Sequence, residues 1–183
     1  EGRFQTRNLV VATEGPTAWK LLGEKLGPAQ REKKPVGTIC LYFRCDAALL
    51  EDREPILYLN GDDTGIVNNC CFLSHVSPSY APQGQTLISV SVVGKDCDVH
   101  ADDEQLVRAV KQELAEWFGD QVTAAWAFIR MYRIPYAQPN QVPPTDFFKD
   151  VKLGPGLYVC GDHRDSATLD GAMRSGTTTA QAL

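Results

Sequence analysis

Two runs near the end of the chain decide the fold: Leu157-Tyr158-Val159-Cys160-Gly161-Asp162 and, nine residues on, Gly171-Ala172-Met173-Arg174-Ser175-Gly176. The four apolar residues of the first run predict a buried strand, which Gly161-Asp162 ends. The second run opens a helix with small residues on one side. A strand, a glycine turn with an acid and a helix start together predict a site that holds a polar ligand.

This turn offers a ligand three kinds of contact. Gly161 allows close approach to the backbone, and Asp162 can accept hydrogen bonds from sugar-alcohol hydroxyls. Backbone N–H groups near Leu169, Asp170 and Gly171 would meet an electron-rich carbonyl edge, aided by the positive end of the helix. An ordinary strand–helix turn, with Asp162 as a capping residue, explains the same pattern equally well.

Composition narrows the class of protein. The chain has 183 residues, of which 43% are hydrophobic, and this is enough for one sizeable core or two small ones. A net charge of −5 argues against a general nucleic-acid binder, and no apolar run approaches the length that spans a bilayer. The six cysteines sit mostly in apolar runs, which favours reduced thiols in an intracellular or organellar compartment.

The apolar periodicity predicts an α+β fold. Residues 8–13 indicate a strand, and residues 17–26 indicate a short helix. Residues 102–118 form the best helix, capped by Asp102 and ended by Gly119. Segments with a period of two, which we predict to be strands, are residues 36–44, 56–60, 66–74, 87–93 and 124–134, the last stopped by Pro135.

These elements suggest a division into domains. Residues 31–151 would form a mixed, largely antiparallel sheet domain with one long helix. Strand–helix pieces of a different style, residues 1–30 and 152–183, flank it at both ends. We expect these end pieces to belong to one α/β layer that the sheet domain interrupts.

With these elements in place, the tail resembles the C-terminal signature of the flavin-containing amine oxidase and phytoene-desaturase-like superfamily. Residues 157–162 and the Gly171-Ala172-x-x-Ser175-Gly176 run carry this resemblance. Three weaker segments agree in order: residues 10–13, residues 87–94 with the helix that ends at Gly119, and residues 132–139. Together they cover most of the chain.

The resemblance implies a bipartite FAD enzyme that removes a hydride from a C–N or C–C bond of a small or lipid-like substrate. Asp162 would hold a ribityl hydroxyl of FAD, the start of the 169–183 helix would face the pyrimidine ring of the flavin, and Thr13 would lie near the cofactor. Residues 36–134 would line the substrate pocket. The most similar members imply a plastid location.

The sequence departs from the family pattern in two places. No G-x-G-x-x-G turn, which holds the ADP half of FAD, follows an N-terminal strand. Thr177-Thr178-Thr179 stand where the family often has basic residues. Residue 1 is Glu rather than Met, and we therefore expect the C-terminal portion of a longer oxidoreductase, or a homologue that needs a partner. A non-catalytic interaction subunit that retains the fold is the alternative.

Other residues leave their roles open. Tyr132 and Tyr136 either face the substrate or lie in the core or at its rim. The pairs Cys97-x-x-His100 and Cys160-x-x-His163 have ligand types that suit tetrahedral zinc. Such short spacings often arise by chance, so a zinc-stabilised binding module is the less favoured hypothesis and we assign no metal site.

Overall fold

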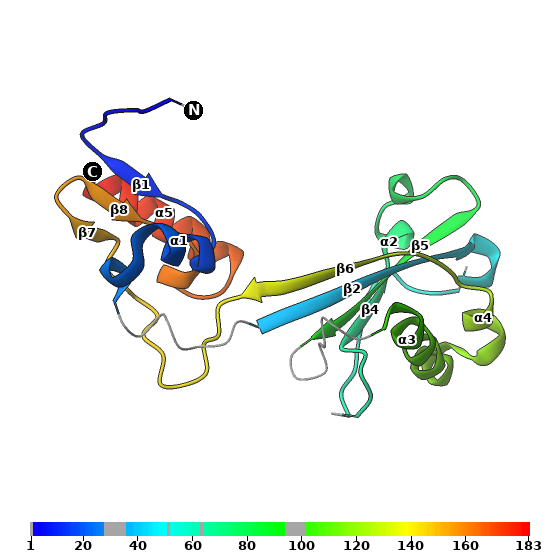
Figure 1. Cartoon of the computed structure of the whole chain (residues 1–183). Coiled ribbons are helices and arrows are strands. Elements are labelled where there is room, and N and C mark those ends of the chain that lie inside the picture. Colours follow the sequence, from blue (N-terminus) through cyan, green and yellow to red (C-terminus); the bar gives the residue numbers. More distant parts are fainter. Residues whose placement is uncertain (1, 28–35, 51, 63, 94–101) are drawn as a thin grey trace. The chain divides into compact units, whose positions relative to one another are not determined.

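The computed structural model describes residues 2–27, 36–50, 52–62, 64–93 and 102–183 (Figure 1). The chain divides into two compact units: unit 1 comprises Glu1–Pro35 and Gln138–Leu183, and unit 2 comprises Val36–Ala137. Both ends of the chain therefore belong to one unit. The loop that follows residue 137, which we predicted to be part of the sheet domain, belongs to unit 1, where Val151 accepts a backbone hydrogen bond from Val159.

Unit 1 contains a short three-stranded sheet in the order β1-β8-β7. Strand β1 (Leu9–Val11) pairs in parallel with β8 (Leu157–Val159), and β7 (Lys152–Gly154) pairs antiparallel with β8. Its helical elements are α1 (Gly15–Leu22), the 3-10 turns η1 (Gly23–Leu26) and η6 (Asp162–Arg164), and α5 (Leu169–Ala182).

A small core joins the elements of unit 1. Val11 and Val159 come from adjacent strands, and Ala18 and Leu26 come from α1 and η1; none of the four is more than 6% exposed. The helix predicted over residues 17–26 begins at Gly15 and tightens into a 3-10 turn after Leu22. That turn places Leu26 in the core.

Unit 2 contains a five-stranded sheet in the order β3-β4-β5-β2-β6 (Figure 1). The pairings β2–β5, β4–β5 and β3–β4 are antiparallel, which confirms the predicted α+β class with a largely antiparallel sheet. The strands are β2 (Val36–Asp46), β3 (Leu57–Leu59), β4 (Asn69–Phe72), β5 (Gln85–Val93) and β6 (Ala127–Gln138). The helical elements are η3 (Ala47–Leu50), α2 (Leu73–Val76), η4 (Pro78–Tyr80), α3 (Asp103–Phe118) and α4 (Asp120–Ala124).

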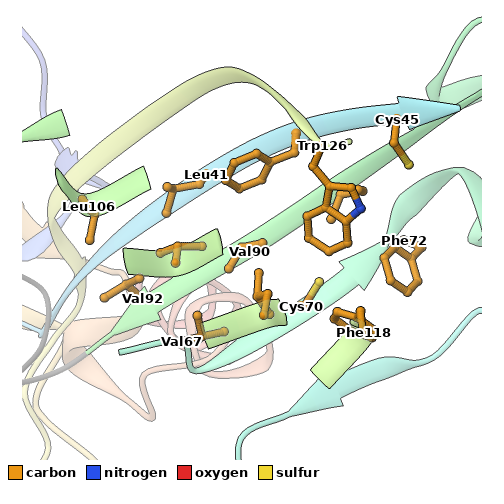
Figure 2. Close-up of a cluster of buried hydrophobic side chains, with 14 of the residues drawn as sticks. Leu41, Cys45, Val67, Cys70, Phe72, Val90, Val92, Leu106, Phe118 and Trp126 are labelled. Atoms are coloured by element: carbon orange, nitrogen blue, oxygen red, sulfur yellow. The ribbon is translucent and has the colours of Figure 1, made fainter. Parts of the chain in front are cut away.

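One face of this sheet forms the main core (Figure 2). Leu41 of β2 and Val90 of β5 are fully buried, and so are their neighbours at every second position. Helix α3 contributes side chains at helical spacing: Leu106, Val110, Leu114 and Phe118. Burying each such side chain stabilises the fold by about 1.5–3 kcal/mol, so this cluster is the largest favourable contribution in unit 2.

Helix α3 agrees closely with the helix predicted over residues 102–118. An Asp102 Oδ1 atom accepts a hydrogen bond from the Gln105 backbone N at 2.9 Å, which caps the first turn. Gly119 follows the helix with φ of 93°, a conformation that favours glycine. The cap contributes about 1 kcal/mol to the stability of the helix.

Strand β6 differs most from its prediction. The predicted strand began at residue 124, where α4 ends, and stopped before Pro135; β6 instead begins at Ala127 and continues through Pro135 to Gln138. This is possible because β6 is the last strand in the sheet order, where a missing N–H leaves no partner strand unpaired. Phe128 is 42% exposed on this edge strand, whereas Trp126, which precedes the strand, is 2% exposed.

The segment predicted as a strand over residues 66–74 is shorter in the structure. Strand β4 ends at Phe72, and α2 begins at Leu73. His75 therefore lies in α2, with its Nδ1 atom 2.9 Å from the backbone O of Arg53. Strands β3 and β4, which lie within the segments predicted as strands over residues 56–60 and 66–74, pair antiparallel.

The described cysteines are free thiols. Cys45 and Cys70 are buried, and Cys40, Cys71 and Cys160 are half-buried. Burial raises the pKa of the Cys45 thiol to about 11, so it stays protonated at neutral pH and packs as a small apolar group. Among the described residues, every helix is too short or too polar to span a lipid bilayer.

Candidate functional site

The turn after β8 depends on Gly161. Its φ of 144° lies in the range that favours glycine, and a Cβ at this position would lie 2.6 Å from Cε1 of His163 and 3.4 Å from the backbone O of Thr13. The Cys160 backbone N donates to the O of Val11 at 3.0 Å, which continues the pairing of β8 with β1. The structure thus brings Thr13 and Gly161, two of the predicted site residues, side by side.

Ser175 fastens helix α5 to this turn. Its hydroxyl oxygen accepts a hydrogen bond from the Gly161 N and lies 2.9 Å from the O of both Gly161 and Ala172. The side chain is only 3% exposed, so these bonds are shielded from water. The small residue that the sequence predicted for close packing therefore also sets the distance between the helix and the turn.

Asp162 opens η6, directly after the glycine. Its carboxylate is 29% exposed and lies 3.8 Å from Nδ1 of His163. Partial burial raises the pKa of this carboxyl, and the negative charge of Glu14 raises it further, while hydrogen bonds from backbone amides oppose the shift. A half-buried carboxylate with raised pKa gains from a ligand that donates hydrogen bonds to it.

In the first turn of α5, one backbone amide donates to a capping side chain and two have no partner among the described residues. The Thr168 Oγ1 atom accepts from the Gly171 N at 2.9 Å and so caps the helix. The amides of Leu169 and Asp170 have no hydrogen-bond partner in the described part of the chain. Two of the three predicted donors are therefore available to a ligand, and the third, on Gly171, is engaged by the cap.

Steric constraints require glycine at position 171. A Cβ at this position would lie 2.0 Å from the backbone O of Ser166, a distance that no side chain could accept without moving the backbone. The close approach of residues 166 and 171 sets where the helix begins. Gly171 therefore positions the donors of Leu169 and Asp170 and does not supply one itself.

Gln141, in the loop that follows β6, holds the same segment by hydrogen bonds, a role that sequence reasoning missed. The Gln141 side-chain Nε2 donates to the O of Asp165 at 2.9 Å, and its Oε1 accepts from the N of Ala167 at 2.9 Å. The Asp165 carboxylate in turn accepts from the Ser166 N and from Arg174 of α5. Nothing in the proline-rich stretch around residue 141 marks this glutamine, because its partners are backbone groups more than 20 residues away.

The side chains that follow Asp162 are buried and polar. His163 is 3% exposed, and burial, together with the charges of Arg164 and Lys149, lowers its pKa to about 4. The imidazole is therefore neutral at pH 7. Arg164 donates from Nη2 to the O of Asp150. The His163 ring packs against Gly161, and the Arg164 guanidinium keeps a positive charge near the turn.

The remaining predicted site residues belong to unit 2. Tyr132 lies on β6, is 47% exposed and makes an edge-to-face contact with Tyr42 at 6.0 Å between ring centroids. Tyr136 lies further along the same strand and is half-buried. Neither belongs to the core cluster, so the rim and substrate-facing interpretations remain for both.

The zinc hypothesis rests on two cysteine–histidine pairs. Cys97 and His100 lie outside the residues that the structure describes. Within the described ranges, no group of three or more His, Cys, Asp or Glu side chains gathers as a metal site would require. Cys160 and His163 lie on either side of the Gly161 turn.

Comparison with known proteins assigns the fold. The sequence profile of a family described as flavin containing amine oxidoreductase matches residues 2–183. The chain belongs to this family. The resemblance of the tail is thereby confirmed, and FAD is the cofactor that membership supports. No curated protein matches the sequence significantly.

Solved structures share the fold at low sequence identity. An oxidoreductase from Methanosarcina mazei is 15% identical with a TM-score of 0.66, and the alignment covers 97% of this chain and 43% of that one. A provisionally named protoporphyrinogen oxidase from Exiguobacterium sp. 255-15 is 16% identical with a TM-score of 0.65, covering 96% and 40%. Putrescine oxidase bound to putrescine is 13% identical with a TM-score of 0.54, covering 86% and 38%. The chain thus spans about two fifths of the length of these proteins.

The residues present around Gly161 fit a flavin. Asp162 supplies an acceptor for hydroxyls, and the unpartnered amides of Leu169 and Asp170 supply donors for a carbonyl edge. Glycine at position 161 lets the His163 ring and the Thr13 carbonyl approach the turn closely, because a Cβ there would meet both. The pairing of an acceptor with two donors matches a ligand that has both a polyol chain and carbonyl oxygens.

Proposed function

We propose that this chain is the C-terminal portion of an FAD-dependent oxidoreductase of the amine oxidase or desaturase type. The reaction removes a hydride from carbon and a proton from the adjacent nitrogen or carbon, which leaves a C=N or C=C bond. FAD, when bound, supplies the two-electron acceptor for the hydride. The plastid location implied by the resemblance stays a prediction.

One observation carries the proposal: Asp162 directly follows the Gly161 turn, and α5, which Ser175 joins to this turn by hydrogen bonds, begins with two unpartnered amides. In this assignment the Asp162 carboxylate accepts a hydrogen bond from a ribityl hydroxyl. The amides of Leu169 and Asp170 donate to the pyrimidine edge of the flavin, where the positive helix end favours electron density. Thr13 lies beside the turn and is the predicted neighbour of the cofactor on β1's side.

The rest of the site holds these groups in place. Ser175, Gln141 and the Thr168 cap fix the turn and the helix start through hydrogen bonds of 2.9 Å. Preorganised donors are effective because they need not reorient when the ligand arrives. The sheet unit, with Tyr132 and Tyr136, is assigned to the substrate.

Flavin binding tests the proposal. Riboflavin carries the ribityl chain and the ring system without the ADP half, so it probes the turn itself. We expect the 183-residue chain to quench riboflavin fluorescence on binding. Asp162→Ala should weaken binding about tenfold, the effect of losing one hydrogen bond to a charged group. Glu24→Ala is the matched control, because it removes an exposed carboxylate from η1 of the same unit.

The outcomes separate the two function classes. Loss of affinity in Asp162→Ala alone supports the flavin site. If the chain bound neither riboflavin nor FAD, and Asp162→Ala behaved as the wild type in every assay, the non-catalytic interaction subunit would be favoured. An equal loss in both variants would show that only net charge matters and would contradict the specific role of Asp162.

A further inference from the structure

The sheet of unit 2 has one face that the core does not use. Every strand residue of the core cluster points to the same side: Ile39, Leu41, Phe43 and Cys45 of β2, Cys70 and Phe72 of β4, and Ile88, Val90 and Val92 of β5. Side chains alternate along a strand, so the residues between them point to the opposite side. We call this opposite side the outer face.

The middle of the outer face is lined by short side chains. In the sheet register Ser89 lies opposite both Tyr42 and Cys71, and Ser91 lies opposite both Cys40 and Asn69. The Sγ atom of Cys40 lies 3.5 Å from the Oγ atom of Ser89. The short side chains of Cys40, Asn69, Cys71, Ser89 and Ser91 leave a level surface across β2, β5 and β4, with the exposed Leu57 and Leu59 of β3 at its far edge. Such a surface is complementary to a flat molecule.

Two tyrosines stand at one side of this level surface. Tyr42 of β2 and Tyr132 of β6 meet edge to face at 6.0 Å between ring centroids. Their contact places the side of β6 that carries Tyr132 on the outer face. Arg133, the next residue, bonds to Asp103 of α3 on the core side, as strand alternation requires.

Arginines flank the tyrosines. The Arg130 guanidinium carbon lies 5.9 Å from the centroid of the Tyr132 ring, which holds the cation over the aromatic face. Arg44 lies two residues beyond Tyr42 on the same side of β2 and is exposed. Neither arginine forms an ion pair with any described residue.

Acidic groups are scarce on the same surface. Among the described outward positions of the five strands, Asp46 is the carboxylate, at the end of β2. Its Oδ1 atom already accepts a hydrogen bond from the Ala48 N at 2.9 Å. The outer face therefore combines a level centre, an aromatic edge and two arginines that form no ion pair with any described residue.

We propose that the outer face binds the substrate and that this substrate is a flat, unsaturated carboxylate. Arginine presents a planar fork of donors that matches a carboxylate, and the tyrosine rings and level centre offer contact to a planar hydrocarbon. Alkyl amines are protonated at neutral pH, so the two arginines repel them. This inference rests on the proposed oxidoreductase function and names its substrate class.

Three ligands of one shape test the charge preference. Naphthalene-2-carboxylate is the anion, naphthalene-2-carboxamide is the neutral isostere, and naphthalen-2-ylmethylammonium is the cation. Isothermal titration of the 183-residue chain at low salt should rank their affinities in that order. Arg44→Gln and Arg130→Gln should each weaken binding of the carboxylate about three- to fivefold and leave binding of the carboxamide unchanged.

Arg108→Gln is the matched control, because Arg108 is an exposed arginine on α3. It should leave all three affinities unchanged. Equal affinity for the three ligands, no binding of the carboxylate, or the same loss in the Arg108 variant would overturn the proposal. Riboflavin binding measured on the same samples reports the Gly161 turn separately, so failure of the carboxylate preference is distinguishable from failure of the flavin assignment.

Discussion

The sharpest prediction concerns two glycines on the same helix. Gly171→Ala places a Cβ 2.0 Å from the backbone O of Ser166, whereas Gly176→Ala meets nothing within 4 Å. Alanine is favoured over glycine by about 1 kcal/mol in a helix interior, where Gly176 lies, and by no more than this in the first turn, where Gly171 lies. The clash therefore dominates the difference between the variants, and we expect it to cost about 2–3 kcal/mol because the obstacle is backbone that has no alternative rotamer.

Hydrogen exchange of the α5 amides measures this difference locally. A loss of 2–3 kcal/mol corresponds to exchange about 30- to 150-fold faster in Gly171→Ala than in Gly176→Ala. A local readout is preferable because the two units need not unfold together. If Gly171→Ala exchanged as slowly as Gly176→Ala, the close approach of residues 166 and 171, and with it the positioning of the free amides, would be refuted.

Two further predictions concern buried polar groups. Burial lowers the pKa of His163 from 6.5 to about 4, so the unfolded chain takes up a proton at a higher pH than the folded chain does. The free energy of unfolding, measured with urea, should therefore decrease by at most about 3 kcal/mol as the pH falls from 6.5 to 4. His163→Gln should abolish this part of the pH dependence. The Glu113 carboxylate of α3 accepts hydrogen bonds from the backbone N of Ile66 at 2.7 Å and of Val67 at 3.1 Å. Glu113→Ala should lower the unfolding free energy of unit 2 by about 2 kcal/mol, whereas Glu116→Ala, an exposed glutamate on the same helix, should have little effect; equal effects would contradict the bracing role.

Local patterns were sufficient for the elements whose neighbours in sequence decide them. The cap, period and exit of α3 lie within one run of residues, and the structure confirms all three. The turn at Gly161 was also predictable, because a strand that ends in glycine and an acid before a helix uses only short-range geometry. The family profile then confirmed the resemblance that the tail suggested.

Other features depended on partners distant in sequence. The continuation of β6 through Pro135 follows from its edge position, and sheet order is not visible in any one segment. Gln141 braces the turn only because the fold brings its loop to residues 165–167. The amide of Gly171, predicted to be a donor for the ligand, is taken by the Thr168 hydroxyl.

The sequence by itself therefore determined the secondary structure of the long helix, the alternation that gives the sheet a core face, and the glycine–acid turn. The tertiary structure alone decided which amides of α5 remain free and which charges gather on the outer face. The physical reason is range: capping and periodicity act within a few residues, whereas hydrogen-bond partners and the charges on a face are set by strands and loops that meet only after folding.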